Sequence, residues 1–157
     1  MPEAVNVRPA THEDMESLVS LLITLFPIEE DFVIDQEKQR RGLEMMLNNG
    51  RGRVMVAVTN QAATTADGTV VGMCSGQLTV STAEGGPAVL IEDVVVREDW
   101  RGQGIGARLM DEISAWARAN EAGRLQLLAD RNNIPALDFY KHLGWQPTQL
   151  ICLRNRL

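Results

Sequence analysis

The sequence predicts an α/β protein whose strands and helices form one layered domain, residues 1–157. A length of 157 residues is enough for a single domain with its own core. A content of 45% hydrophobic and 23% charged residues is typical of a globular protein and excludes a disordered chain. Apolar residues recur with periods of about two in some segments and about 3.6 in others, so strands and helices alternate along the chain.

The first third of the chain is expected to contain one strand and two helices. Val5–Arg8 alternates apolar and polar residues as a strand does. Thr11 and Asp14 have the spacing of a capping box, and Pro27 should end the helix that they begin. The second helix should stop at 48–50, where the chain reads Asn-Asn-Gly. Apolar positions of the first helix recur at helical spacing: Leu18, Leu21, Leu22 and Leu25.

Three strands follow, over 53–59, 69–80 and 88–96, with turns near Asp67-Gly68 and Gly85-Gly86 between them. Their β-branched content and the glycine-containing turns favour neighbouring strands of one sheet.

The last third begins with an amphipathic helix from 104 to about 120. A strand over 125–128 and a helix over 135–143 come next, and Gly144 should end that helix. Residues 145–157 are expected to form one or two terminal strands. The apolar face of the long helix carries Ile105, Leu109, Ile113 and Trp116.

The net charge of −6 is concentrated at the start of the chain. Residues 1–50 hold ten acidic and four basic residues, and the remainder is balanced. An acidic first third opposes nucleic-acid binding, because phosphates need the opposite charge. Two interpretations stay open: a solvated acidic face, or a surface that attracts a cationic partner.

Cys74 and Cys152 are isolated and lie near no histidine cluster, so we expect neither a disulfide scaffold nor a metal site. The apolar stretch Leu18–Phe26 is too short to span a bilayer, so we expect no membrane partner. The sequence begins Met-Pro-Glu-Ala, without the pattern of an export signal. We therefore expect a cytoplasmic location.

The most informative segment joins the strand 88–96 to the following helix. Gly102, Gly104 and Gly106 allow the backbone to approach a ligand closely and to present successive N–H groups to an anion. The helix dipole adds to that attraction, so the segment predicts a phosphate-binding loop. A P-loop is excluded, because Ala107-Arg108 stands where that motif needs lysine and serine or threonine. The glycine spacing fits a dinucleotide fold poorly, and an oxidoreductase fragment is kept as an alternative.

The spacing Arg-x-x-Gly-x-Gly at Arg101, Gly104 and Gly106 resembles the pyrophosphate loop of the GNAT superfamily of N-acetyltransferases. The resemblance includes the order of elements and so covers nearly the whole chain. It implies an α/β fold with a mixed, twisted central sheet flanked by about four helices. A second signature matches downstream, at Asn133, Ala136, Tyr140, Gly144 and Trp145.

The resemblance implies that the cosubstrate is acetyl-CoA. Amides of the loop and the Arg101 side chain would meet its pyrophosphate, and the peptide-like pantetheine would pair with the strand as an extra strand does. Asn133 would hold the pantetheine from the other side. The cofactor-binding set is Val94, Val95, Val96, Arg101, Gly102, Gln103, Gly104, Ile105, Gly106, Ala107 and Asn133.

Acetyl transfer to an ammonium group requires a base. Period-two alternation places Glu92 on the face of Val94, whereas Asp93 points away unless a β-bulge intervenes. Glu92 is the first candidate and Asp93 the second. An N–H near Val94 could stabilise the oxyanion. Tyr140, matched by the motif, would protonate the departing thiolate.

The acceptor is expected to be a small cationic amine, because Glu29, Glu30 and Asp31 lie in the loop that commonly walls the acceptor cleft of this family. Direct attack in a ternary complex is preferred to an acyl-cysteine route, since neither cysteine lies in the motif. The alternatives are a non-catalytic CoA-binding sensor or scaffold, and an enzyme that acetylates protein or peptide amines. The oligomeric state is left open, with a homodimer among the options.

Overall fold

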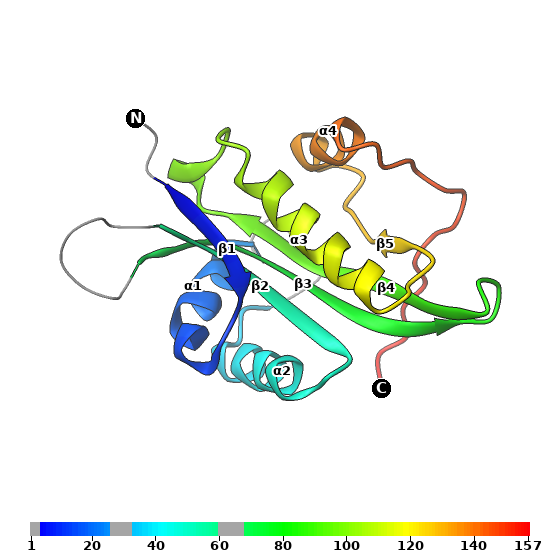
Figure 1. Ribbon diagram of the computed structural model, residues 1–157, viewed down its shortest axis with the longest axis horizontal. Coiled ribbons are helices and arrows are strands. Elements are labelled where there is room, and N and C mark those ends of the chain that lie inside the picture. The colour runs from blue at the N-terminus through cyan, green and yellow to red at the C-terminus, as the bar shows by residue number, and fades with distance from the viewer. Residues whose placement is uncertain (1–3, 26–32, 60–67) are drawn as a thin grey trace. The chain divides into compact units, whose positions relative to one another are not determined.

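A computed structural model describes residues 4–25, 33–59 and 68–157 of the chain (Figure 1). The described chain divides into two compact units, Met1–Gln126 and Leu127–Leu157. The expectation of a single domain over 1–157 stays a prediction. The acidic residues Glu29, Glu30 and Asp31 lie outside the described residues.

Five strands form one sheet in the order β1-β2-β3-β4-β5. Strands β1 to β4 pair antiparallel with their neighbours. The strands are β1 (Val5–Pro9), β2 (Gly52–Thr59), β3 (Val70–Ser81), β4 (Gly86–Val96) and β5 (Leu125–Leu127).

The chain enters β5 parallel to β4, which makes the sheet mixed. The Gly123 N–H donates to the Pro87 carbonyl and the Val89 N–H donates to the Arg124 carbonyl, each at 2.9 Å. Both chains advance in the same direction across these two bonds, as parallel strands do.

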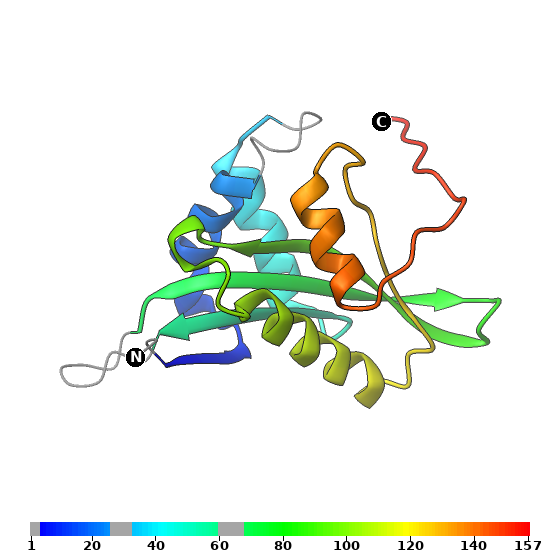
Figure 2. The same cartoon turned by 90° about the horizontal axis from the view of Figure 1, so that it is seen from above.

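Helices cover both faces of the sheet in the first unit (Figure 2). Helices α1 (Met15–Leu25) and α2 (Gln36–Asn48) lie on one face, and α3 (Ile105–Ala119) lies on the other. Short 3-10 helices cover His12–Asp14 and Glu98–Trp100.

The core between the sheet and α1–α2 is aliphatic, as a chain with only 4% aromatic residues requires. Met73 of β3 and Val95 of β4 project into it. The helices contribute five leucine and valine side chains that are almost fully buried: Leu18, Val19, Leu21, Leu22 and Leu43.

Helix α3 lies close against β3 because two glycines face it. A Cβ at Gly72 would lie 3.2 Å from Leu109 Cδ1, and a Cβ at Gly76 would lie 3.3 Å from Ile113 Cδ1. Both separations are tighter than ordinary van der Waals contact. Glycine therefore allows the close approach of α3 to the sheet.

The capping box expected at the start of α1 is confirmed. The Thr11 N–H donates to Asp14 Oδ2 at 2.8 Å, and Arg8 donates to both carboxylate oxygens at 2.8 and 3.0 Å. Burial by itself raises the pKa of the Asp14 carboxyl, but the hydrogen bonds from Arg8 and Thr11 outweigh it and hold the pKa below its usual value. The pair ties β1 to the first helical turn.

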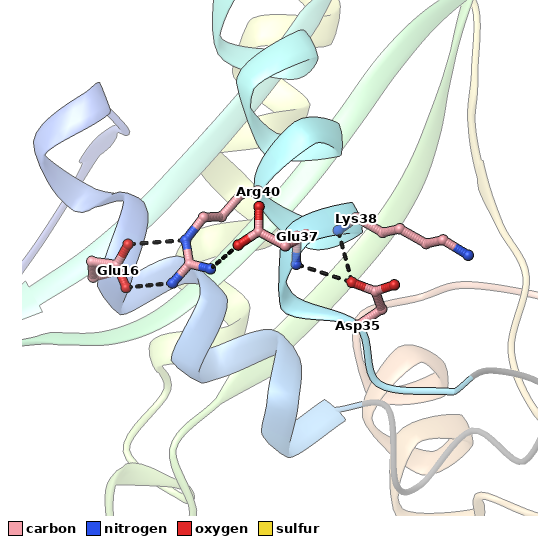
Figure 3. Close-up of polar contacts among 5 residues, drawn as sticks. All are labelled: Glu16, Asp35, Glu37, Lys38 and Arg40. Carbon is pink, nitrogen blue, oxygen red and sulfur yellow. Dashed lines mark hydrogen bonds and ion pairs between the residues drawn. The ribbon is translucent and has the colours of Figure 1, made fainter.

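Helix α2 begins at Asp35, whose carboxylate accepts hydrogen bonds from the Glu37 and Lys38 amides at 3.1 and 3.2 Å (Figure 3). Arg40 of α2 donates to both carboxylate oxygens of Glu16 in α1. Asp35 therefore has a structural role at the end of the acidic segment.

The seven strands and helices for which both bounds were predicted lie within two residues of them, but the prediction of terminal strands is wrong. Residues 143–157 contain no strand, and helix α4 (Ile134–His142) is the only helix described in the second unit. A strand needs the backbone of a neighbouring strand to pair with. In the described second unit, the only residue that belongs to a strand is Leu127 of β5. Pro147 also removes one donor.

Asp14→Asn should lower the free energy of unfolding by about 1–3 kcal/mol at pH 7, the scale of a hydrogen bond to a charged group. Because the folded pKa of Asp14 lies below its unfolded value, its stabilising effect is fully present above the unfolded pKa and is lost as the pH falls through the folded pKa. Urea unfolding of both proteins from pH 7 down to pH 2 should show the difference shrinking with acidification. A constant difference would contradict the assignment.

Candidate functional site

Within the described residues of the first unit, the outer edge of β4, away from β3, is paired along only part of its length. Residues 123 and 124 lie level with 87–89. In the same parallel register, Gln126 is the last residue of the first unit, and it comes no further along β4 than Ile91. Within that unit, the edge from Glu92 to Val96 therefore has no strand partner. An extended, peptide-like group could pair there through backbone hydrogen bonds.

The same stretch of β4 contains a β-bulge. Gly76 pairs with Ile91 and Cys74 pairs with Val94, so Ser75 alone opposes two residues, Glu92 and Asp93. Ser75 Oγ donates to Asp93 Oδ2 at 3.1 Å and accepts from the Asp93 N–H at 3.2 Å. Ser75 is only 2% exposed.

The bulge changes the faces on which the two candidate bases lie. Ile91 pairs with Gly76 on the α3 face, so Glu92 points to the opposite face. Asp93, two residues before Val95, points to that opposite face as well. The period-two argument that placed Glu92 with Val94 therefore fails at the bulge. Both carboxylates lie on the α1–α2 face, with Glu92 exposed and Asp93 half-buried.

The glycine-rich loop folds back onto the end of β4. Arg101 Nε donates to the Val96 carbonyl at 3.0 Å. Gly102 and Gly104 adopt φ angles of +76° and +78°, the left-handed region that favours glycine. A Cβ at either glycine would meet no atom within 4 Å. The backbone therefore borders open space, into which a ligand can come close.

Helix α3 begins directly at this loop, with Gly104 as its N-cap. The first hydrogen bond within the helix runs from the Arg108 N–H to the Gly104 carbonyl, at 3.1 Å. The N–H groups of Ile105, Gly106 and Ala107 precede it and point out of the helix end, where the dipole is positive. This arrangement suits a phosphate group.

Two arginines near the loop, Arg101 and Arg108, each donate a hydrogen bond to a backbone carbonyl. Arg101 binds Val96, as described, and Arg108 Nη1 donates to the Val5 carbonyl at 2.6 Å, which fixes β1 to α3. Exposed Gln103 lies between the two glycines of positive φ.

Cys74, next to the bulge on β3, is fully buried. Burial, with a smaller contribution from the negative charge of Asp93, raises the pKa of the Cys74 thiol to about 12. Its Sγ donates to the Leu109 carbonyl at 3.5 Å. The thiol is therefore protonated at neutral pH and is a poor nucleophile.

The downstream signature builds the second unit. Asn133 is the N-cap of α4, and its Oδ1 accepts from the Ala136 N–H at 3.3 Å. The Tyr140 ring lies 5.8 Å from the Trp145 ring, centroid to centroid. Gly144 has φ +89°, which turns the chain so that the Trp145 N–H reaches the Tyr140 carbonyl at 3.0 Å. All five signature residues therefore cap, turn or pack α4.

Two buried polar residues were not found from the sequence. Ser75 lies in a segment with the pattern of a strand, and a serine there does not indicate that the neighbouring strand contains a bulge. Gln39 of α2 is 7% exposed, and neither polar atom of its side chain has a hydrogen-bond partner within the described ranges. Its position four residues before buried Leu43 was the available sign that it faces inward.

Comparison with known proteins decides the family. The profile of the acetyltransferase (GNAT) family matches residues 24–145, which include the glycine loop and the α4 signature. The chain belongs to the GNAT family. An α/β fold with a mixed sheet flanked by helices and an acetyltransferase activity are thereby established, as the resemblance implied.

Curated relatives of this GNAT protein are acetyltransferases. N-alpha-acetyltransferase 80 of Mus musculus is 42% identical over 72 residues, 44% of this chain but only 22% of that protein. Aminoglycoside N(6')-acetyltransferase type 1 of Stenotrophomonas maltophilia is 26% identical over 153 residues, 94% of this chain and 90% of that enzyme.

Solved structures share the fold. An aminoglycoside N-acetyltransferase in complex with CoA superposes with a TM-score of 0.82 at 14% identity, covering 99% of this chain and 97% of the other. A probable acetyltransferase superposes with a TM-score of 0.80 at 19% identity, covering 97% of each chain.

None of the helices in the described residues combines the length and the apolar character needed to span a membrane. The same residues also contain no group of three or more histidine, cysteine or acidic residues that could hold a metal ion.

Gly104→Val should weaken CoA binding at least tenfold, because a branched side chain would fill the open space beside the loop and would strain a backbone at φ +78°. Isothermal titration calorimetry with CoA measures the effect. Gly85→Val is the matched control, since Gly85 also has positive φ, at +69°, and lies in a turn outside the site. Equal CoA affinity of folded Gly104→Val and wild-type protein would refute the phosphate-loop assignment.

Proposed function

We propose that this GNAT protein moves the acetyl group of acetyl-CoA to the primary amine of a small cationic molecule, by direct attack in a ternary complex. The proposal rests on one observation: the edge of β4 that is open within the first unit leads directly through the glycine-rich loop to the N-terminus of α3. One surface then offers strand pairing for pantetheine and amides for the pyrophosphate.

The backbone supplies most of the proposed cosubstrate contacts. Amides from Gln103 to Ala107 would bind the pyrophosphate, and the edge of Val94–Val96 would pair with the pantetheine. Since the Val96 carbonyl already accepts from Arg101, Val94 is the stronger pairing position. Asn133 would bind the pantetheine through its amide nitrogen, because its Oδ1 accepts from Ala136.

Glu92 is the proposed base, with Asp93 second. The acceptor arrives as an ammonium ion, and Glu92 would take its proton, directly or through water. The free amine then attacks the thioester carbonyl carbon, a C–N bond forms and the C–S bond breaks. CoA leaves as a thiolate that would take a proton from Tyr140, and the attacking nitrogen releases its extra proton to water, which restores the neutral amide and, through solvent, the Tyr140 phenol. The exposure of Glu92 supports this role, since a base must return its proton to solvent.

The protonated, buried Cys74 supports direct transfer over an acyl-cysteine intermediate. A thiol with a pKa of about 12 offers almost no thiolate at pH 7. Cys152 is exposed and lies in the second unit, beyond the family signature.

Tyr140→Phe should lower kcat by roughly tenfold to a thousandfold, the scale of a lost proton donor. The Km for acetyl-CoA should stay within about threefold of wild type, because only the hydroxyl is removed. Phe139→Leu is the control for packing, because the Phe139 ring centroid lies 5.2 Å from that of Tyr140. Steady-state thiol release measures all three proteins, and an unchanged kcat in a chemistry-limited assay would make Tyr140 a packing residue only.

A cationic acceptor is supported by the acidic first third of the chain and by the aminoglycoside relative. Neutralising Glu29, Glu30 and Asp31 together to Gln, Gln and Asn should raise the acceptor Km and leave the acetyl-CoA Km unchanged. Added salt should raise the wild-type acceptor Km and affect the variant less. If neither the substitutions nor salt change that constant, the acidic segment serves solvation only.

A peptide amine is the second candidate acceptor, favoured by the match to an N-alpha-acetyltransferase over 72 residues. A thiol-release screen with acetyl-CoA against aminoglycosides, polyamines, amino acids and peptides separates the two. Turnover with peptides alone would reject the small-amine proposal. CoA binding without thiol release from any amine would indicate a sensor or scaffold instead of an enzyme.

A further inference from the structure

The bulge in β4 is held by a side chain from the neighbouring strand. At the bulge, β4 has one residue more than β3, so Ser75 opposes both Glu92 and Asp93. Regular strand pairing therefore provides no separate partner for the Asp93 N–H. Ser75 Oγ accepts that N–H at 3.2 Å and donates its proton to Asp93 Oδ2 at 3.1 Å. One hydroxyl thus satisfies both the backbone and the side chain of Asp93.

The direction of the Asp93 amide indicates which way the next amide points. Successive N–H groups of a strand point to opposite edges. With the Asp93 N–H directed at Ser75 on β3, the Val94 N–H is directed at the opposite edge. That edge is the one without a strand partner in the first unit.

The carboxylates of Asp93 and Glu92 differ in burial and in hydrogen bonding, although both lie on the α1–α2 face. The Asp93 carboxylate is half-buried and accepts from a serine that is 2% exposed. Its charge also acts on the buried Cys74 thiol beside it. Glu92 is exposed. A carboxylate fixed in this way suits a structural task better than proton exchange with an incoming ammonium ion.

We propose that Ser75 and Asp93 are positioning residues that lock the β4 bulge and thereby aim the Val94 N–H at the thioester carbonyl oxygen, leaving proton removal to Glu92. The inference rests on the proposed acetyl transfer. The Val94 amide would stabilise negative charge on that oxygen while the amine attacks. Neither positioning side chain needs to touch the substrates.

The test compares kcat and Km in the thiol-release assay for Ser75→Ala, Ser75→Thr, Asp93→Asn and Glu92→Gln. Ser75→Ala should lower kcat by roughly tenfold to a hundredfold, with the acetyl-CoA Km within about twofold of wild type. Ser75→Thr keeps the hydroxyl and should restore kcat to within about fivefold. Asp93→Asn keeps an oxygen that accepts from Ser75 and should stay within about fivefold, whereas Glu92→Gln should lose at least a hundredfold.

Ser81→Ala is the matched control. Ser81 is another buried serine of β3, and its Oγ accepts from the Glu84 amide and from Arg124, far along the strand from the bulge. It should lower the melting temperature and leave kcat unchanged. If Ser75→Ala does not fold, Asp93→Ala replaces it, with the same expected loss of kcat relative to Asp93→Asn.

Two results would overturn the inference. One is a Ser75→Ala enzyme, or its Asp93→Ala replacement, with wild-type kcat. The other is an Asp93→Asn enzyme as impaired as Glu92→Gln, which would make Asp93 a base. A wild-type protein that releases no thiol with any acceptor would instead refute the proposed function.

Discussion

The close packing of α3 against β3 is the constraint on which the rest of the site depends. Gly72 and Gly76 present no side chain to the helix, and a Cβ at these positions would lie only 3.2 Å from Leu109 and 3.3 Å from Ile113. A larger residue at either position would push the helix outward. Because the proposed phosphate-binding loop lies at the N-terminus of α3, that displacement would move its amides away from the end of β4.

Strand β4 performs two tasks that require different backbone geometry. Up to Ile91 it is an ordinary internal strand, paired with β3 and with the chain entering β5. After the bulge it keeps its pairing with β3 at Val94–Val96, but its other edge is open within the first unit. The bulge marks this change, and it brings two carboxylates to the α1–α2 face.

Arginine side chains in the first unit act mainly as ties between segments. Arg8 joins β1 to Asp14, Arg108 joins α3 to the Val5 carbonyl, and Arg101 joins the loop to Val96. A rigid loop with preoriented amides binds an anion at a lower entropic cost than flexible cationic side chains do. The loop amides are therefore proposed to bind the pyrophosphate together with the motif arginine.

The sequence by itself determined the element order, the capping box and the glycine loop, because each depends on neighbours within a few residues. Period and cap chemistry locate a helix such as α3, and glycine spacing identifies a turn that needs positive φ. The partnership of Ser75 with Asp93, the face of Glu92 and the lack of a strand in residues 143–157 were decided only by tertiary structure. These features depend on which strand lies alongside which and in what register, and one extra residue in β4 reverses the alternation that a single strand predicts.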